Sequence, residues 1–225
     1  MIKTKTYGEL IVISGTTCAG KGTIIKKLIE RNPNLNLSIS YTSREKRINE
    51  IDGKDYYFVT DQKFEEMIQN NMFLEYAKVQ YNKYYGTPKK EVKNLLERGK
   101  DVILEIDVEG AKQIKKQYPK TILIFIMAPS MEEVKKRIKS RGTETKEQII
   151  NRFKVAYNEI NEVNKYNYIV VNDHLEDAVK KVESILISEK CRVDRIEEIY
   201  MENEEEIIHE FLIDKDFDNN IDELK

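Results

Sequence analysis

The sequence has few of the residues that build disulfide frameworks and metal centres. Its 225 residues include only two cysteines, Cys18 and Cys191, and two histidines, His174 and His209. This content excludes a disulfide scaffold and a histidine-rich metal site, and nothing in it suggests a zinc site. The scarcity of cysteine favours a reducing, cytoplasmic location.

Long hydrophobic runs are missing as well. No apolar run approaches the ~18 residues that a membrane span needs, and Met1–Leu10 has no apolar signal-peptide core. Hydrophobic residues still make up 40% of the chain, which is enough to bury a core. The length fits one large domain or a domain with an appendage, and we expect no membrane partner.

Charges of the two signs balance over the whole chain but not along it. The chain has 38 basic and 40 acidic residues, yet Asp194–Lys225 holds 13 acidic and three basic ones. The sequence therefore predicts a basic body over 1–190 and an acidic C-terminal extension over 191–225, helical or partly disordered. Apolar positions such as Ile199 and Ile207 could line a helix that packs on the body or on a second subunit. The acidic sign argues against nucleic acid as a partner.

Short apolar runs alternate with helical periodicity along the body. The expected strands are 10–13, 37–40, 56–59, 102–106, 122–127 and 168–171, with a hairpin over 73–85. The expected helices include 61–70, 111–117, 131–139, 146–163 and 175–186. We expect Asp61 to cap one helix, and Thr87 to cap another with Pro88 at its first position. This alternation predicts an α/β fold whose parallel central sheet is covered on both faces.

A glycine-rich stretch follows the first strand and precedes a helix. Gly15–Lys21 matches the pattern G-x-x-x-x-G-K in the context that a phosphate-binding loop requires. Its glycines let backbone N–H groups surround an anion, and the helix N-terminus adds roughly half a positive charge. The alternative is a glycine-rich turn with a solvated lysine. We expect ATP to be bound here by Gly15, Thr16, Thr17, Cys18, Ala19, Gly20, Lys21, Gly22 and Thr23.

Seven further segments carry distinctive patterns of polar and aromatic residues. They are Ser38–Arg47, Glu50–Val59, Phe73–Ala77, Tyr84–Pro88, Leu104–Gly110, Arg141–Thr145 and Val170–Asp173. In the same order they resemble S-x-S-x-T-T-R-x-x-R, E-x-x-G-x-D-Y-x-F-V, F-x-E-W/Y-A, Y-Y-G-T-P, L-x-I-D-x-Q-G, R-G-T-x-T/S and V-N-D of the guanylate kinase family. The agreement runs from about Leu10 to about Leu186, which is most of the chain.

The resemblance implies a P-loop NTPase fold in three layers, with a GMP-binding subdomain near 40–90 and a lid near 130–160. The implied reaction transfers the γ-phosphoryl group of ATP to GMP, and to dGMP, in purine nucleotide metabolism. Gly22 stands where a serine or threonine normally binds Mg²⁺. No direct protein ligand is therefore expected, and ATP phosphates and water near Thr23 and Asp107 would hold the ion.

The resemblance also implies the residues that bind GMP. Arg44 and Arg47 would clamp its phosphate, because guanidinium forks match phosphate oxygens. Glu75 would accept hydrogen bonds from guanine N1–H and the exocyclic amino group, a donor pair that AMP lacks; such mismatches can discriminate by ~10⁴. Each of these residues, taken singly, could instead be a solvated charge or a packing residue. The full implied set is Ser40, Arg44, Arg47, Tyr56, Glu75, Tyr85, Thr87 and Asp107.

Phosphoryl transfer needs positioning and charge neutralisation more than covalent chemistry. By resemblance, the lid arginines Arg137, Arg141 and Arg152 would close on the ATP phosphates, and Asn172 would contact the adenine end. The implied catalytic residues are Lys21, Arg44, Arg141 and Arg152.

The chain departs from the family pattern at two places. Cys18 occupies a position where the family often has glycine, so a positive φ there would cost about 1 kcal/mol. The segment Val79–Tyr85 is one residue longer than usual. We expect the extra residue at the hairpin tip; otherwise Tyr84 would replace Tyr85 as the phosphate contact.

Two other functions remain as alternatives. One is a non-catalytic guanylate-kinase-like module that binds phosphorylated peptides, which Lys21, Arg141 and Arg152 argue against. The other is a kinase with a different acceptor such as a ribose bisphosphate, which Glu75 and Ser40 argue against. A basic body fits a site that collects two anionic nucleotides. The oligomeric state is left open.

Overall fold

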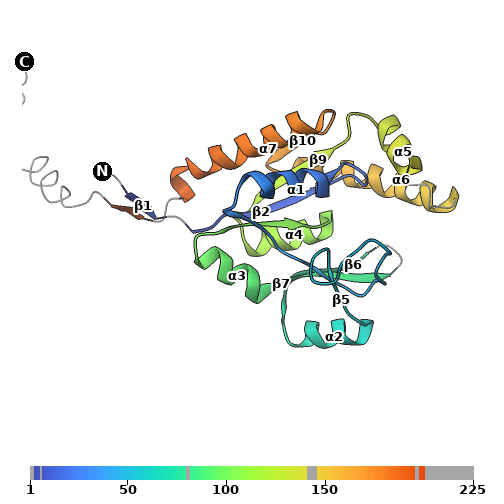
Figure 1. Cartoon of the computed structure of the whole chain (residues 1–225), viewed down its shortest axis with the longest axis horizontal. Helices are drawn as coiled ribbons and strands as arrows, with labels where there is room; N and C mark the ends of the chain where they lie inside the picture. Colours follow the sequence, from blue (N-terminus) through green and yellow to red (C-terminus); the bar gives the residue numbers. More distant parts are fainter. Residues whose placement is uncertain (1–2, 6, 80–81, 141–145, 196–197, 201–225) are drawn as a thin grey trace, which may run out of the picture.

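The computed structural model describes residues 3–5, 7–79, 82–140, 146–195 and 198–200 (Figure 1). The strands are β1 Lys3–Lys5, β2 Leu10–Gly15, β3 Leu35–Leu37, β4 Tyr41–Thr42, β5 Tyr57–Phe58, β6 Phe73–Val79, β7 Lys83–Pro88, β8 Asp101–Glu105, β9 Ile122–Met127, β10 Tyr168–Val171 and β11 Glu198–Tyr200. The helices are α1 Lys21–Arg31, α2 Asp61–Gln69, α3 Lys89–Glu97, α4 Val108–Gln117, α5 Met131–Ser140, α6 Lys146–Ile160 and α7 Leu175–Lys190. Short 3₁₀ helices cover Val163–Lys165 and Val193–Arg195.

A parallel five-stranded sheet forms the centre of the molecule, with strand order β10-β9-β2-β8-β3. Helices α1 and α7 cover one face, and α3 and α4 cover the other (Figure 1). Strand β2 shows why its sequence fits this place. Ile11 and Ile13 belong to the core under α1 and α7, whereas Leu10 and Val12 belong to the core over α3 and α4. Because alternate side chains point to opposite faces, a central strand must be apolar throughout.

The predicted α/β architecture with a parallel central sheet is thus confirmed. A second sheet of order β5-β4-β7-β6 lies below the central one in Figure 1, with α2 packed on it. Its core is aromatic: Phe64 is fully buried and stacks on Phe73 and on Tyr84, with ring centroids 4.5 Å and 4.9 Å away. Helices α5 and α6 pack on each other through a small apolar cluster that includes Val134, Ile138 and Ala156.

Several expected boundaries are wrong. The strand expected at 37–40 is instead β3 at 35–37, because the chain leaves the central sheet after Leu37 and joins the second sheet at Tyr41. Thr60, and not Asp61, caps α2 by accepting a hydrogen bond from the Lys63 N–H at 3.1 Å. Helix α3 begins at Lys89, so Pro88 and not Thr87 precedes its first residue. Helix α4 begins at Val108 and not at 111, and α6 ends at Ile160 and not at 163.

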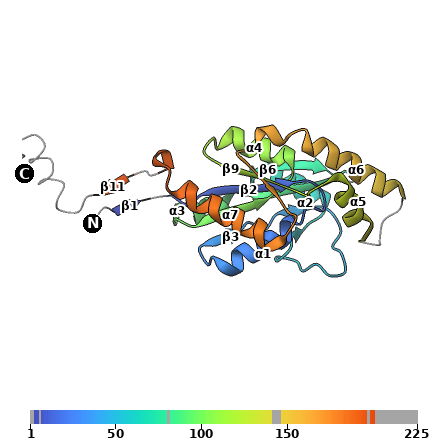
Figure 2. The ribbon, with the colours of Figure 1, turned by 90° about the horizontal axis from the view of Figure 1, so that it is seen from above.

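The start of the C-terminal extension also differs from the expected helix. Residues 198–200 form β11, which pairs antiparallel with β1, and the two strands lie side by side, set apart from the body on its left in Figure 2. Arg195 joins the extension to the body through Glu9 at 2.7 Å and Glu189 at 2.5 Å. Residues 201–225 and the hairpin tip at 80–81 lie outside the described residues. No helix in the described part of the chain is long and apolar enough to cross a membrane.

Candidate active site

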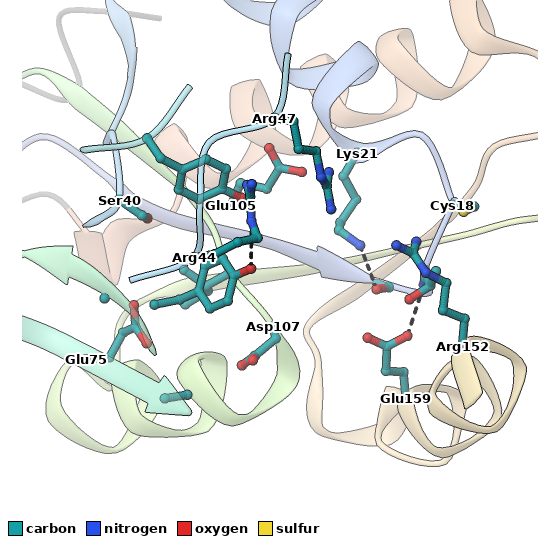
Figure 3. A pocket seen from close by; sticks show the side chains of 17 residues that line it. Cys18, Lys21, Ser40, Arg44, Arg47, Glu75, Glu105, Asp107, Arg152 and Glu159 are labelled. Atoms are coloured by element: carbon teal, nitrogen blue, oxygen red, sulfur yellow. Dashed lines mark hydrogen bonds between the residues drawn. The ribbon is translucent and has the colours of Figure 1, made fainter. Parts of the chain in front are cut away.

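One cavity of about 260 Å³ opens at the carboxyl ends of β2 and β8, between the second sheet and α6 (Figure 3). We call it the central pocket. It is lined by Gly15, Thr17, Cys18, Lys21, Ser40, Arg44, Arg47, Tyr56, Glu75, Ala77, Tyr85, Gly86, Glu105, Ile106, Asp107, Arg152 and Glu159. Twelve of these residues were expected in the site from the sequence, and they come from segments as far apart as the loop after β2 and helix α6.

The phosphate-loop motif forms the turn between β2 and α1. Gly15 has a φ of 142°, and a Cβ there would lie 1.8 Å from the Ile126 carbonyl oxygen, so only glycine fits. Lys21 donates from Nζ to the carbonyl oxygens of Gly15 at 2.8 Å and Thr16 at 3.2 Å. The ammonium group is therefore held at the mouth of the loop. Cys18 has a φ of 62°, the left-handed conformation considered from the sequence.

A buried carboxylate lies on the second sheet, in β6. Glu75 is 4% exposed and accepts a hydrogen bond from the Thr87 hydroxyl at 2.6 Å. Burial, with a smaller contribution from nearby Asp107, raises the pKa of Glu75 to about 7. Gly110 permits this placement, because a Cβ at that residue would lie 2.6 Å from Glu75 Oε2. The carboxylate is thus a strong acceptor in the pocket with room for a further donor.

Two arginines and two tyrosines line the pocket near this carboxylate. Arg44 donates from Nε to the Tyr85 hydroxyl at 3.1 Å and forms a bidentate ion pair with Glu50. Burial raises the pKa of Tyr56 to about 12, which keeps its hydroxyl protonated. Arg47 lines the same wall. This wall offers cationic and hydroxyl donors to an anion.

The expected lid residues are only partly described. Arg152 lines the pocket from α6. Arg137 donates to Glu133 at 3.0 Å and to the Asn172 carbonyl at 3.2 Å, and the Asn172 amide donates to the Ala19 carbonyl at 2.7 Å. These two residues connect α5 to the back of the phosphate loop. Arg141 lies outside the described residues.

Other predicted residues lie beside the pocket lining. Thr16, Ala19, Gly20 and Gly22 belong to the phosphate loop or to the start of α1, and Thr23 is exposed there.

Three carboxylates of the site carried no predicted role. Glu105 ends β8, and Glu159 on α6 accepts a hydrogen bond from the Thr17 N–H at 3.0 Å. Burial raises the pKa of both groups, and Lys21 opposes the rise. Glu159 follows Arg152 by seven residues, so the two lie on one face of α6; this spacing is a signal for Glu159 in the sequence, although it does not reveal the contact with Thr17. Glu50 lies within a recognised motif, but its contact with Arg44 depends on the shape of a loop.

A family model described as guanylate kinase matches residues 7–189. The chain belongs to the guanylate kinase family. The guanylate kinase of Clostridium tetani is 57% identical over 207 residues, which cover 92% of this chain and 99% of that protein. The guanylate kinase of Caldanaerobacter subterraneus is 54% identical over 204 residues, covering 91% of this chain and 98% of that protein.

A solved structure agrees with this assignment. The crystal structure of guanylate kinase from Anaplasma phagocytophilum superimposes with a TM-score of 0.73 at 31% identity, covering 86% of this chain and 92% of that one. Family membership makes this chain a nucleoside-monophosphate kinase, an ATP:GMP phosphotransferase with ATP and GMP as its substrates. The geometry of the central pocket indicates which residues could bind each substrate.

Proposed function

We propose that the central pocket holds GMP and the phosphates of ATP end to end for direct phosphoryl transfer. One observation carries this proposal: a phosphate loop and a buried carboxylate on a second sheet line the same cavity. The first feature fits the phosphates of ATP, and the second fits a guanine base. In-line transfer requires this kind of arrangement, with the acceptor phosphate facing the γ-phosphate.

The second sheet supplies the acceptor site in this proposal. Glu75 accepts from guanine N1–H and the exocyclic amino group, while Ser40, Thr87 and Asp107 complete the polar surround of the base. Arg44, Arg47, Tyr56 and Tyr85 bind the GMP phosphate. Because Tyr85 accepts from Arg44 Nε, its own hydroxyl proton stays available for a phosphate oxygen. Residues 40–90 would then form the GMP-binding subdomain.

The loop after β2 supplies the donor site. Backbone N–H groups of residues 15–23 surround the ATP phosphates. The Lys21 ammonium group stabilises the negative charge of the γ-phosphoryl group while that group is transferred to the acceptor. The lid over 130–160 would bring Arg137, Arg141 and Arg152 onto the transferred group and exclude water. Asn172 would support the adenine end. The kinase domain would span 1–190, with 191–225 as an appended segment.

Mg²⁺ is the expected companion of ATP, and the residues of the pocket fit a hydrated ion. Glu105 and Asp107 present half-buried carboxylates there, and the position of a Cβ on Gly22 would be 3.7 Å from Glu105 Oε2. Carboxylate oxygens suit Mg²⁺, which usually keeps several waters. The ion would neutralise phosphate charge, and these two residues would orient its water shell. Thr23, which is exposed, is the weaker candidate.

The proposal extends to dGMP as an acceptor, to a role in purine nucleotide metabolism and to a cytoplasmic location, with no nucleic acid as partner. A coupled assay of ADP release with GMP, AMP, CMP and UMP tests its centre. We expect strong turnover with GMP and much weaker turnover with the other three. Equal rates with AMP and GMP would refute the guanine site, and folded protein without any turnover would favour a peptide-binding module.

A further inference from the structure

Glu50 is a carboxylate that contacts Arg44 in the wall of the central pocket, and it has no role in the proposed acceptor site. It lies in the loop between β4 and β5, and its side chain is 15% exposed. Its two oxygens accept from Arg44 Nη2 and Nη1, each at 2.8 Å, and Oε2 also accepts from the Arg47 backbone N–H at 2.8 Å. Arg44 lowers the pKa of Glu50, so the group is ionised at neutral pH. One carboxylate thus contacts both of the arginines that are proposed to bind the GMP phosphate.

The guanidinium group of Arg44 is held by hydrogen bonds along its edges and by aromatic rings near its planar faces. A guanidinium has five N–H donors. The Tyr85 hydroxyl takes Nε–H, Glu50 takes one N–H from each terminal nitrogen, and the Glu45 carbonyl takes the second N–H of Nη1 at 2.7 Å. The rings of Tyr56 and Phe58 lie 5.4 Å and 5.6 Å from Arg44 Cζ. The second N–H of Nη2 has no acceptor among the residues that the structure describes.

Arg47 is held differently. Its side chain is 57% exposed, and its Nη1 lies 3.8 Å from Glu50 Oε1, beyond hydrogen-bond distance. The hydrogen bond from the Arg47 backbone N–H to Glu50 fixes the point from which this side chain extends, whereas its guanidinium group makes no hydrogen bond to Glu50. Glu50 therefore immobilises one arginine and places the other.

We propose that Glu50 is the positioning residue of the phosphate clamp: it fixes the plane of Arg44 and the origin of Arg47 before GMP arrives. This rests on the proposed acceptor site. A preformed clamp pays its ordering cost during folding and not during binding. The two arginines carry a charge of +2, and together with the Glu50 carboxylate the three side chains carry +1. The clamp therefore works by the orientation of its donors more than by its net charge.

The opposite role is physically possible and makes the opposite prediction. Glu50 could be a stand-in anion that occupies the Arg44 fork and competes with the phosphate. Removing its charge would then tighten GMP binding. In the positioning role, an amide in its place turns one N–H group toward the guanidinium, breaks the fork and weakens GMP binding. The sign of the effect separates the two roles.

The experiment compares the wild-type protein with Glu50→Gln and with Glu45→Gln as matched control. The control removes the same charge from the same loop, where the backbone carbonyl of Glu45, and not its carboxylate, accepts from Arg44. Dissociation constants of GMP and of guanosine are measured by calorimetry. For Glu50→Gln we expect GMP to bind about tenfold more weakly, guanosine to be unchanged and kcat at saturating GMP to stay within about twofold.

Glu45→Gln should resemble the wild type with both ligands. Tighter GMP binding by Glu50→Gln, or unchanged GMP binding, would overturn the positioning role. An equal loss for GMP and guanosine would overturn it as well, because a phosphate clamp cannot act on guanosine. Glu50→Asp keeps the charge but shortens the side chain, so wild-type affinity for GMP in that variant would show that charge alone suffices and would also overturn the positioning role. Failure of the proposed function would look different, because the wild-type protein itself would not bind GMP.

Discussion

In the proposed acceptor site Glu75 would have to be ionised to accept from guanine, so the affinity for GMP should fall as the pH drops from 8 to 6. Burial raises the pKa of this carboxyl group to about 7 in the free protein. Guanine N1–H and the exocyclic amino group donate only to the carboxylate, so binding lowers that pKa again. Above pH 8 the group is already ionised and GMP binds without displacing a proton. Below pH 7 each bound GMP must release one.

The size of the effect follows from that pKa. With a pKa of about 7, the ionised fraction of Glu75 is roughly nine-tenths at pH 8 and roughly one-tenth at pH 6. The dissociation constant should therefore rise about tenfold over this range. The GMP phosphate also titrates, near pH 6 if it resembles other phosphate monoesters, and would add its own dependence. Guanosine carries no phosphate, so it reports the carboxyl group alone.

Calorimetry with guanosine at pH 6, 7 and 8 measures the effect directly. Titration in two buffers of different ionisation enthalpy adds a second readout, the proton released on binding near and below pH 7. The matched variant is Glu75→Gln, which should bind guanosine weakly and with no pH dependence. A guanosine affinity that is flat from pH 8 to 6 in the wild type would refute the reasoning, as would the same slope in both proteins.

Two further predictions follow from contacts around the site and the core. Gly110→Ala places a Cβ 2.6 Å from Glu75 Oε2, so the KM for GMP should rise about tenfold while the KM for ATP, measured in the same coupled assay, stays unchanged. Arg195→Ala leaves the buried Glu189 and the partly buried Glu9 without their shared cation. It should lower the free energy of unfolding by about 3–5 kcal/mol in urea titrations, whereas Arg192→Ala, at 51% exposure, should change it little.

Local periodicity was enough to predict the body of the fold. The apolar run at 122–127 and the strand before the phosphate loop are both present, because strands buried on two faces must be apolar at every position. The register of distant pairs could not be predicted in this way. Strand β11 pairs with β1 across almost the whole chain length, and no local pattern in 198–200 distinguishes that strand from a helix.

The site shows the same limit at the level of single side chains. The phosphate-loop motif and the resemblance to the guanylate kinase family together predicted that Lys21, Arg44 and Glu75 would share a pocket, and they do. They did not predict that Arg44 would already be engaged by Glu50, because that contact depends on the path of the loop between β4 and β5. Nor did they predict that Glu159 would bond the phosphate loop across 142 residues of sequence.

The charge of the pocket changes how the basic body should be understood. The cations that line it are Lys21, Arg44, Arg47 and Arg152, and the acidic residues that line it are Glu75, Glu105, Asp107 and Glu159. The two sets are equal in number, so the count of charged side chains does not by itself explain the attraction of two anionic nucleotides. Recognition must come from where each donor points, because a charge held in a fixed direction at low dielectric stabilises a phosphate more than a solvated one does. The carboxylates serve that end: Glu50 is hydrogen-bonded to Arg44, Glu159 is hydrogen-bonded to the phosphate loop, and in the proposed acceptor site Glu75 would select the base.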